Sequence, residues 1–365
     1  MRQGATIEGL RATAYTIPTD APEADGTLSW DSTTMVLVRV RAGGREGVGY
    51  SYAHEAAAML IGGKLADAVR GLSAMDVPAA WEAMRRTIRN LGRQGLVAEA
   101  ISAVDIALWD LKAKLLDVSL SDLLGKRRSE IPIYGSGGFT SYDDARLTDQ
   151  LSGWVEDLGC AWVKMKVGTH PDDDPRRVAV ARGAVGRAGL FVDGNGAYSV
   201  KQAIELGERF ADCGVTWFEE PVTADDLPGL GLLRQRLPAG IEVAAGEYIF
   251  TLDRARRLLE AEAVDVMQLD ATRCLGLTGF MMAAAQAEAH HVDLSCHCAP
   301  ALHLHAACAG PRMRHIEWFH DHVRIEAMLF DGAPQARGGV VAPDAGRPGL
   351  GLDFKEADAE RWRVH

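Results

Sequence analysis

The sequence predicts an α/β fold in which a barrel of parallel strands follows a smaller α+β domain. Three observations lead to this prediction. The first third of the chain mixes hairpin and helical patterns, and from residue 131 onward short β-rich runs alternate with amphipathic helical stretches. In addition, a charged or polar side chain ends each run, as expected for parallel βα units whose functional residues gather at the carboxyl ends of the strands.

The N-terminal α+β domain is expected to cover residues 1–128. Three runs have the composition of strands, and Gly43-Gly44 provides the turn between the last two: 6–17, 33–41 and 47–53. Three helical patterns follow: 55–70, 76–91 and 98–116. The segment Pro18–Ser32 contains neither lysine nor arginine and is predicted to be a mobile loop.

The barrel is expected to cover residues 129–331. Eight β-rich runs are its predicted strands: Ile131–Ser136, Trp162–Val167, Leu190–Asn195, Val215–Glu220, Ile241–Glu247, Val264–Asp270, Val292–His297 and Ile316–Phe319. The last unit is less regular than the others. Residues 332–365 are expected to return to the N-terminal domain.

Composition excludes several classes of function. The net charge of -11 leaves no basic stripe for a nucleic-acid partner, and no apolar stretch is long enough to cross a membrane. The first residues lack the apolar run of a secretory signal. The six cysteines are scattered along a chain with ample core, so we expect free thiols in a reducing cytoplasm.

Polar residues stand at the ends of all eight predicted strands: Ser136, Lys164 with Lys166, Asp193 with Asn195, Glu219, Glu247, Asp270, His297 and Glu317. From Lys166 to Glu317 the successive steps are 27, 26, 28, 23, 27 and 20 residues, each about one βα unit. Packing alone would favour valine, isoleucine or leucine at these positions. The pattern therefore indicates an active site at one end of the barrel.

A metal site is predicted from Asp193, Glu219 and Glu247. These residues end neighbouring strands, and carboxylates that converge repel one another unless a cation lies among them. Oxygen ligands without imidazole or thiolate favour Mg²⁺, one ion per subunit. Glu220 alternates away from Glu219 and is expected to form a structural ion pair.

Two candidate bases flank this metal site. Lys166 needs a lowered pKa to act as a base, and Lys164 beside it is expected to supply that shift. On the other side, Asp270 would orient His297 and raise its basicity. A small-molecule carboxylate held on the metal would then have a base on each face.

Further side chains are expected around the substrate. Glu317 would stabilise the second oxygen of an enediolate, and Ser136 would contact the substrate carboxylate. Asn195 shares the face of Asp193 and is a substrate-binding candidate. The histidines late in the sequence are mostly expected to be packing or surface residues, but His320 and His322 follow the last strand and are candidates for the pocket mouth.

The segment Cys296-His297-Cys298 has the residue types of a zinc site. Alternation along a strand, however, is expected to place both sulfur atoms on the face away from the imidazole. The sequence therefore predicts no zinc site here.

Together, these motifs resemble the mandelate racemase subgroup of the enolase superfamily: Lys164-Met165-Lys166, Asp193 with Asn195, Glu219-Glu220-Pro221, Gly246-Glu247, Asp270, His297 and Glu317. The resemblance covers essentially the whole chain. It implies a (β/α)7β TIM-like barrel, with an N-terminal capping domain that the C-terminal tail completes, and a homo-oligomer. It also implies Lys166 and His297 as the bases, Asp270 as the partner of His297, three carboxylate metal ligands, and Glu317 as the electrophile.

The resemblance implies removal of the proton next to a carboxylate, and three outcomes remain open. Loss of a β-hydroxyl as water would give a 2-keto-3-deoxy acid, and this acid-sugar dehydration is the leading interpretation. Return of a proton from the other face would racemise a 2-hydroxy acid, and a third outcome opens or closes a lactone.

Capping residues are expected to select the substrate, with Trp30, Tyr50, Tyr52 and His54 as candidates. The first capping loop is otherwise polar, which suits a polyhydroxylated chain better than an aryl group. Its lack of lysine and arginine favours a monoacid over a diacid, although His54 or a barrel residue would be able to supply the missing cation.

Overall fold

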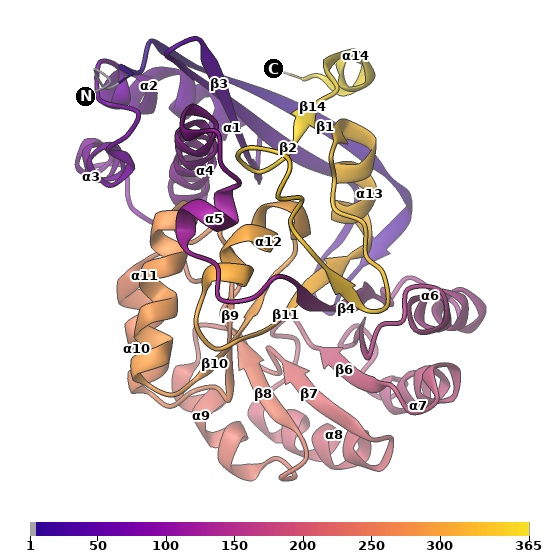
Figure 1. Ribbon diagram of the computed structural model, residues 1–365. Coiled ribbons are helices and arrows are strands. Elements are labelled where there is room, and N and C mark those ends of the chain that lie inside the picture. Colours follow the sequence, from indigo (N-terminus) through magenta and orange to yellow (C-terminus); the bar gives the residue numbers. More distant parts are fainter. Residues whose placement is uncertain (1–4, 365) are drawn as a thin grey trace.

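The computed structural model describes residues 5–364 and places a mixed α+β region against one end of a closed barrel (Figure 1). In this region the strands β1 (Gly9–Ala24), β2 (Ser29–Ala42) and β3 (Arg45–Tyr52) form an antiparallel sheet in that order. The long helix α4 (Leu96–Leu116) lies on β3. A Cβ atom at Gly47 or Gly49 would come within 2.4 Å of the α4 backbone at Ala107, so these glycines permit the close packing.

Shorter helical elements complete the N-terminal region: α1 (Ala56–Leu60), the π-helical η1 (Ile61–Leu65), α2 (Ala66–Val69), α3 (Val77–Thr87) and α5 (Leu120–Leu124). Trp81 on α3 is buried, and its indole N–H donates to the carbonyl oxygen of Leu275 in the barrel at 2.9 Å. The N-terminal region is thereby tied to the barrel through its helices.

The prediction of a mobile loop at Pro18–Ser32 is wrong. β1 and β2 continue through most of this segment as a two-stranded arm, with a register shift between Pro18 and Glu23 and a tight turn closed by the bond from Asp25 N–H to the Leu28 carbonyl at 2.9 Å. An arm that leaves its parent sheet has no apolar face of its own. Its polar composition is therefore typical of a loop, although cross-strand hydrogen bonds hold the two strands of the arm in an extended conformation.

The barrel has the eight predicted parallel strands: β4 (Ile131–Gly137), β5 (Trp162–Lys166), β6 (Gly189–Asp193), β7 (Val215–Glu219), β8 (Glu242–Ala245), β9 (Val266–Leu269), β10 (Asp293–Cys296) and β11 (Met313–Phe319). Each strand pairs with the next, and β11 pairs with β4 to close the ring. The predicted fold class is confirmed.

A helix follows each strand: α6 (Asp144–Glu156), α7 (Asp174–Val185), α8 (Val200–Asp212), α9 (Leu227–Arg236), α10 (Leu252–Glu260), α11 (Gly276–Ala289), α12 (Pro300–Ala309) and α13 (His320–Leu329). Several begin with a capping side chain, such as Ser199, which accepts the N–H of Gln202 at the start of α8. Within residues 5–364, no helix has the length and apolarity that crossing a membrane requires.

A layer of aromatic and smaller apolar side chains fills the barrel below the strand ends. It consists of Tyr134, Phe191, Trp217, Ala244 and Val266, all buried. Phe191 and Trp217 stack with ring centroids 5.0 Å apart. This layer is the floor beneath the polar residues of the next layer.

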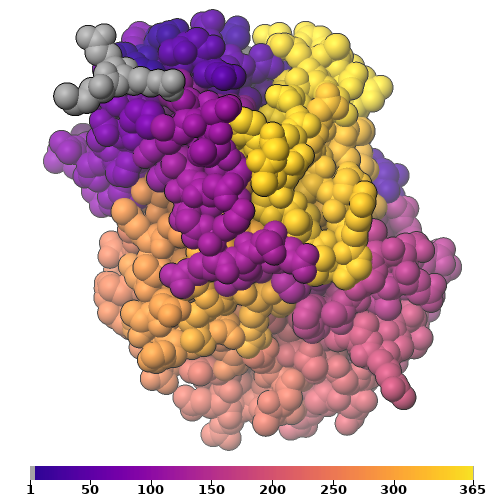
Figure 2. Space-filling view, in the orientation of Figure 1, coloured from indigo at the N-terminus to yellow at the C-terminus, as the bar shows by residue number. Residues whose placement is uncertain are grey.

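The C-terminal segment runs from the barrel to the N-terminal sheet. It contains β12 (Phe330–Asp331), β13 (Val340–Val341), β14 (Asp353–Phe354), α14 (Glu356–Ala359) and the 3₁₀ turn η2 (Glu360–Trp362). β13 pairs with β4, and Arg363 bridges to Tyr15 of β1. Figure 2 shows the yellow C-terminal residues beside the purple N-terminal ones at the same end of the molecule.

Candidate active site

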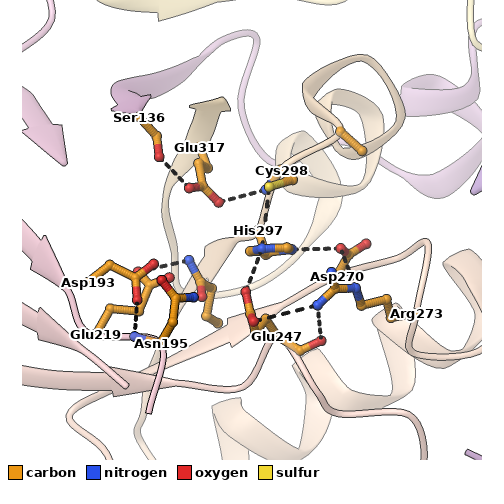
Figure 3. A network of polar contacts seen from close by, with 12 residues as sticks. Ser136, Asp193, Asn195, Glu219, Glu247, Asp270, Arg273, His297, Cys298 and Glu317 are labelled. Atoms are coloured by element: carbon orange, nitrogen blue, oxygen red, sulfur yellow. Dashed lines mark hydrogen bonds and ion pairs between the residues drawn. The ribbon is translucent and has the colours of Figure 1, made fainter. Parts of the chain in front are cut away.

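A cluster of buried charged groups lies where the barrel strands end (Figure 3). Lys164, Lys166, Asp193, Glu219 and Glu317 stand on the strands themselves. Glu247, Asp270 and His297 follow within two residues of a strand end. None of these side chains is more than 6% exposed. Parallel strands thus bring together groups that the sequence separates by more than 150 residues.

A cleft of about 600 Å³ opens onto this cluster. Its barrel wall contributes Lys166, Asn195, Glu247, Tyr248, Arg273, His297, Cys298, Phe319 and His322. The N-terminal region contributes Asp25, Leu28, Trp30, Ser32, Thr33, Thr34, Tyr52, Ala53, His54 and Glu99. A larger hollow of about 670 Å³ lies beside it and shares Asn195 and Tyr248, but it contains neither lysine nor His297. Chemistry rather than size therefore identifies the cleft as the candidate site.

The two lysines of β5 point into the ring of carboxylates. Lys164 Nζ lies 2.6 Å from Glu219 Oε1 and 2.8 Å from Glu317 Oε1, and Lys166 Nζ lies 2.6 Å from Asp193 Oδ2. Burial lowers the pKa of Lys166 and so does Lys164, but Asp193, Glu219 and Glu247 together raise it above its usual value. Lys164 therefore lowers the pKa of Lys166 as expected, but the net shift is upward because the surrounding carboxylates dominate.

His297 lies between two carboxylates. Its Nδ1 is 2.7 Å from Asp270 Oδ2, and its Nε2 is 2.7 Å from Glu247 Oε2. Thr272 holds the other oxygen of Asp270 through its N–H and its hydroxyl group, both at 2.7 Å. Burial lowers the pKa of His297, but the neighbouring acidic groups raise it well above its usual value. The imidazole is therefore oriented through Nδ1, and Nε2 faces the cleft.

Asp193, Glu219 and Glu247 stand at the ends of β6, β7 and β8. Burial, with Asp193 nearby, raises the pKa of Glu219 to about 8. Their oxygens do not all lie within 4.8 Å of one another, because the lysines hold Asp193 and Glu219 while His297 holds Glu247. Positive side chains thus provide the compensation that a cation would otherwise supply.

The donor set fits Mg²⁺. All three groups are carboxylates, and two further oxygens nearby, Glu220 Oε1 and Asn195 Oδ1, are buried without a hydrogen-bond partner in the described chain. Hard oxygen donors are the ligands that Mg²⁺ prefers, and unpartnered buried oxygens favour a nearby cation or its bound water. The observed residues are therefore able to hold this ion.

Glu220 differs from the prediction. It is 2% exposed, has a φ of 36°, and forms no ion pair within residues 5–364. Burial and then Glu247 raise its pKa well above the usual value. β7 ends at Glu219, so strand alternation does not extend to Glu220, and the turn keeps its carboxyl group among the other acids.

Cys298 also departs from simple alternation. β10 ends at Cys296, and Cys298 has a φ of 49°. Its Sγ atom lies 3.3 Å from His297 Nε2, on the imidazole side rather than away from it. Cys296, which remains in the strand, is fully buried. The prediction that both sulfur atoms face away from His297 is wrong because the strand stops between them.

Two predicted substrate contacts lie outside the cleft. Ser136 is fully buried and donates to Glu317 Oε1 at 2.5 Å, so it acts on Glu317 rather than on the substrate. Tyr50 is also fully buried, and its hydroxyl donates to Glu326 Oε1 at 2.7 Å. Tyr52 lines the cleft instead, because it lies nearer the end of β3.

Of the other candidates from the sequence, most line the cleft and one lies outside it. Trp30, His54 and Asn195 line the cleft, and so does His322, whereas His320 pairs with Asp20 at 3.1 Å outside it. Sequence reasoning missed the cleft residues Thr33, Thr34 and Tyr248. The position of Tyr248 directly after the predicted ligand Glu247 was the available signal for one of them.

Comparisons with known protein families match both parts of the chain. The family described as mandelate racemase / muconate lactonizing enzyme, N-terminal domain, matches residues 12–125. The family described as enolase C-terminal domain-like matches residues 146–358. The two matches follow each other in the order of the observed sheet and barrel.

Similar proteins extend over the whole length. An L-talarate/galactarate dehydratase of Salmonella typhimurium is 30% identical and aligns with 98% of this chain and 91% of its own. A D-galactarolactone cycloisomerase of Agrobacterium fabrum is also 30% identical, over 94% and 95%. Relatives at this similarity therefore carry out two of the reactions considered above.

Solved structures also match the chain over its whole length. A mandelate racemase/muconate lactonizing enzyme-like protein from Rubrobacter xylanophilus superposes with a TM-score of 0.96, at 48% identity, over 98% of this chain and 100% of that one. The Salmonella dehydratase, in a crystal structure with Mg and L-lyxarohydroxamate, superposes with a TM-score of 0.91, at 28% identity, over 100% and 94%.

Proposed function

Because this chain belongs to the mandelate racemase / muconate lactonizing enzyme family of the enolase superfamily, we propose that it is a Mg²⁺-dependent sugar-acid dehydratase. It removes the proton next to the substrate carboxylate and expels the β-hydroxyl as water, which leaves a 2-keto-3-deoxy acid. One observation carries the proposal: Lys166 and a carboxylate-oriented His297 line the same cleft from strands three places apart in the closed ring.

Asp193, Glu219 and Glu247 would hold the metal. When bound, Mg²⁺ supplies positive charge next to the substrate carboxylate, which acidifies the adjacent C–H bond. Lys166 Nζ, directed into the cluster from β5, would accept that proton on one face once its partner Asp193 is neutralised by the metal rather than by the ammonium group. His297 Nε2 serves the other face, where as imidazolium it gives a proton to the departing hydroxyl group.

Glu317 and Lys164 are placed to stabilise the negative charge that develops on the substrate carboxylate. Glu317 receives three contacts: the Ser136 hydroxyl at 2.5 Å, the Cys298 N–H at 2.8 Å and Lys164 Nζ at 2.8 Å. These contacts fix its carboxyl group in one orientation. Fixed polar groups in a buried site stabilise a developing charge without reorganising during the reaction.

The substrate is a monoacid rather than a diacid. Of the cleft residues from the N-terminal region, Asp25 and Glu99 are acidic, and none in the described chain is lysine or arginine. Arg273 is the barrel arginine in the cleft, and it lies 3.7 Å from both Glu247 and Asp270. A second carboxylate at the distal end would meet negative charge, whereas Ser32, Thr33 and Thr34 suit the hydroxyl groups of an aldonic acid.

The second candidate is a lactone cycloisomerase, favoured by the 30% identity with the Agrobacterium enzyme. It uses the same proton abstraction, but the leaving group is the ring oxygen of a lactone and stays attached to the product. Racemisation of a 2-hydroxy acid is a third outcome for two bases that serve opposite faces. The reaction product distinguishes the three.

The compartment and the assembly belong to the proposal as well. All six cysteines are free thiols, which supports a reducing cytoplasm. A homo-oligomer follows from the family, and light scattering of the purified protein tests it.

The test is incubation of the Mg²⁺-loaded protein with matched panels of sugar monoacids and diacids, followed by semicarbazide trapping of 2-keto acids. We expect a signal from a monoacid that EDTA abolishes and added Mg²⁺ restores. Silence from folded, metal-loaded protein across both panels contradicts dehydration. A signal from diacids alone contradicts the assignment of a monoacid.

A further inference from the structure

Cys298 lies against the catalytic face of His297, although no step of the proposed reaction uses its thiol. Its Sγ atom is 3.3 Å from His297 Nε2, the nitrogen that faces the substrate (Figure 3). Two consecutive residues, Cys298 and Ala299, have positive φ angles of 49° and 38°. The chain is held in this uncommon conformation by the bond from Cys298 N–H to Glu317 Oε2 at 2.8 Å.

Three different donor types converge at this point. One sulfur, nitrogen or oxygen atom from each of Cys298, His297 and Glu317 lies within 4.8 Å of the others, and all three side chains are buried. A set of thiolate, imidazole and carboxylate is typical of Zn²⁺ and other thiophilic ions, whereas Mg²⁺ prefers oxygen alone. The carboxylates on β6 to β8 and this trio therefore select different metals.

The imidazole is already arranged as a ligand. Asp270 accepts from His297 Nδ1 at 2.7 Å, which leaves Nε2 on the side of Glu247 at 2.7 Å and Cys298 at 3.3 Å, and a carboxylate behind a metal-binding histidine is the usual supporting contact. Both Cys298 and His297 line the cleft, so a cation has access to them. Burial, with Glu317 nearby, raises the pKa of the Cys298 thiol to about 12, so a metal must displace the thiol proton.

We propose that Cys298, His297 and Glu317 form a second metal site, which binds a thiophilic divalent cation such as Zn²⁺ and blocks the histidine base. On binding, a metal–sulfur bond and a metal–Nε2 bond form, the thiol proton and the Nε2 proton pass to solvent, and Nε2 is no longer free to carry a substrate proton. The loss of activity rests on the proposed role of His297, but the metal site itself does not.

The first test uses Co²⁺ as a spectroscopic probe on the Mg²⁺-loaded full-length protein. A cobalt ion bound to thiolate gives a near-ultraviolet charge-transfer band that a cobalt ion among carboxylates does not. We expect this band in the wild type and in Cys213→Ser, a control thiol at the end of α8, and its loss in Cys298→Ser. Absence of the band from the wild type, or its persistence in Cys298→Ser, overturns the proposal.

The second test measures turnover in excess Mg²⁺ while Zn²⁺ is added. Removal of one ligand should weaken inhibition by about tenfold or more in Cys298→Ser relative to Cys213→Ser. Equal inhibition of both variants means that Zn²⁺ acts at the carboxylates, which overturns the blocking of His297. Should Cys298→Ser fail to fold, alkylation of the wild type mapped by mass spectrometry replaces it: Zn²⁺ must protect Cys298, and unprotected Cys298 overturns the site.

The two proposals fail separately. A cobalt band that depends on Cys298, in a protein that turns over no sugar acid, contradicts the proposed function and leaves the metal site standing. Turnover that depends on Mg²⁺ without any such band contradicts the metal site alone.

Discussion

Glu326 shows how a single buried carboxyl group links the two parts of the molecule. It stands on α13 after the last barrel strand and accepts the Tyr50 hydroxyl of β3 at 2.7 Å and the Ala301 N–H at 3.1 Å. Burial raises its pKa to about 8. The pKa of this carboxyl group is thus higher in the folded than in the unfolded protein. Such a group contributes its full stabilisation at pH values below the unfolded-state pKa. The contribution is lost as pH rises through the folded-state pKa.

We therefore predict that Glu326→Gln removes part of the decline in stability between about pH 4.5 and pH 8. Glutamine mimics the protonated acid, so above pH 8 the variant should be the more stable protein, by on the order of a few kcal/mol. Thermal unfolding at pH 6 and pH 9, followed by circular dichroism, measures the effect. The exposed Glu205→Gln of α8 is the control, and a pH dependence identical to the wild type in Glu326→Gln contradicts the account.

At this scale, the sequence predicted residue types better than residue environments. The positions of Lys166, Asp193 and His297 followed from spacing, because one βα unit has a nearly constant length. The pKa of Lys166 and the position of Cys298 did not follow. The first depends on the distance to Asp193, and the second on a turn with positive φ that strand alternation does not describe.

At the scale of elements, the arm formed by β1 and β2 closes one side of the cleft. Its turn docks on the loops after β4, β5 and β6: the Asp25 carbonyl accepts the hydroxyls of Thr140 at 2.9 Å and Thr169 at 2.7 Å. Gly26 lies so close that a Cβ atom there would come within 2.6 Å of the carbonyl oxygens of Val167 and Gly194. The loops after β5 and β6 immediately follow Lys166 and Asp193.

Gly26→Ala is predicted to push the arm away from these loops and to lower kcat/KM by about 10- to 100-fold, because small displacements of substrate-positioning groups are costly. The melting temperature should change little, since the turn lies at the end of the arm. Gly9→Ala at the start of β1 is the matched control, because a Cβ atom there meets nothing within 4 Å. Equal kcat/KM values for Gly26→Ala and Gly9→Ala would contradict this role for the arm.

Periodicity predicted the elements of the barrel, since parallel strands are apolar runs with helices between them. It did not predict the arm. Residues 18–24 and 29–32 are stabilised by pairing with each other and by docking on distant loops, and neither interaction leaves an apolar pattern in the sequence.

For the whole molecule, the metal couples the site to the stability of the fold. Asp193, Glu219, Glu220 and Glu247 are buried close together, and an ion that binds only the folded state stabilises it by about 2.7 kcal/mol at a hundredfold excess over its Kd. We predict that Mg²⁺ raises the melting temperature by several degrees and that EDTA reverses this shift. Asp193→Asn should lose the shift, whereas Asp212→Asn at the exposed end of α8 should keep it. An equal Mg²⁺ shift in both variants would contradict the assignment of the ligands.

Removal of the proton next to the carboxylate is common to dehydration, racemisation and lactone chemistry, so it is the central claim. The most direct measurement is proton NMR of a sugar monoacid with Mg²⁺-loaded protein in D₂O. We expect loss of the C2 proton signal, with deuterium entering C3 of a 2-keto-3-deoxy product, and loss of this reaction in Lys166→Met and His297→Asn. Retention of the C2 proton in every acid tested, or unchanged reaction in both variants, would contradict it.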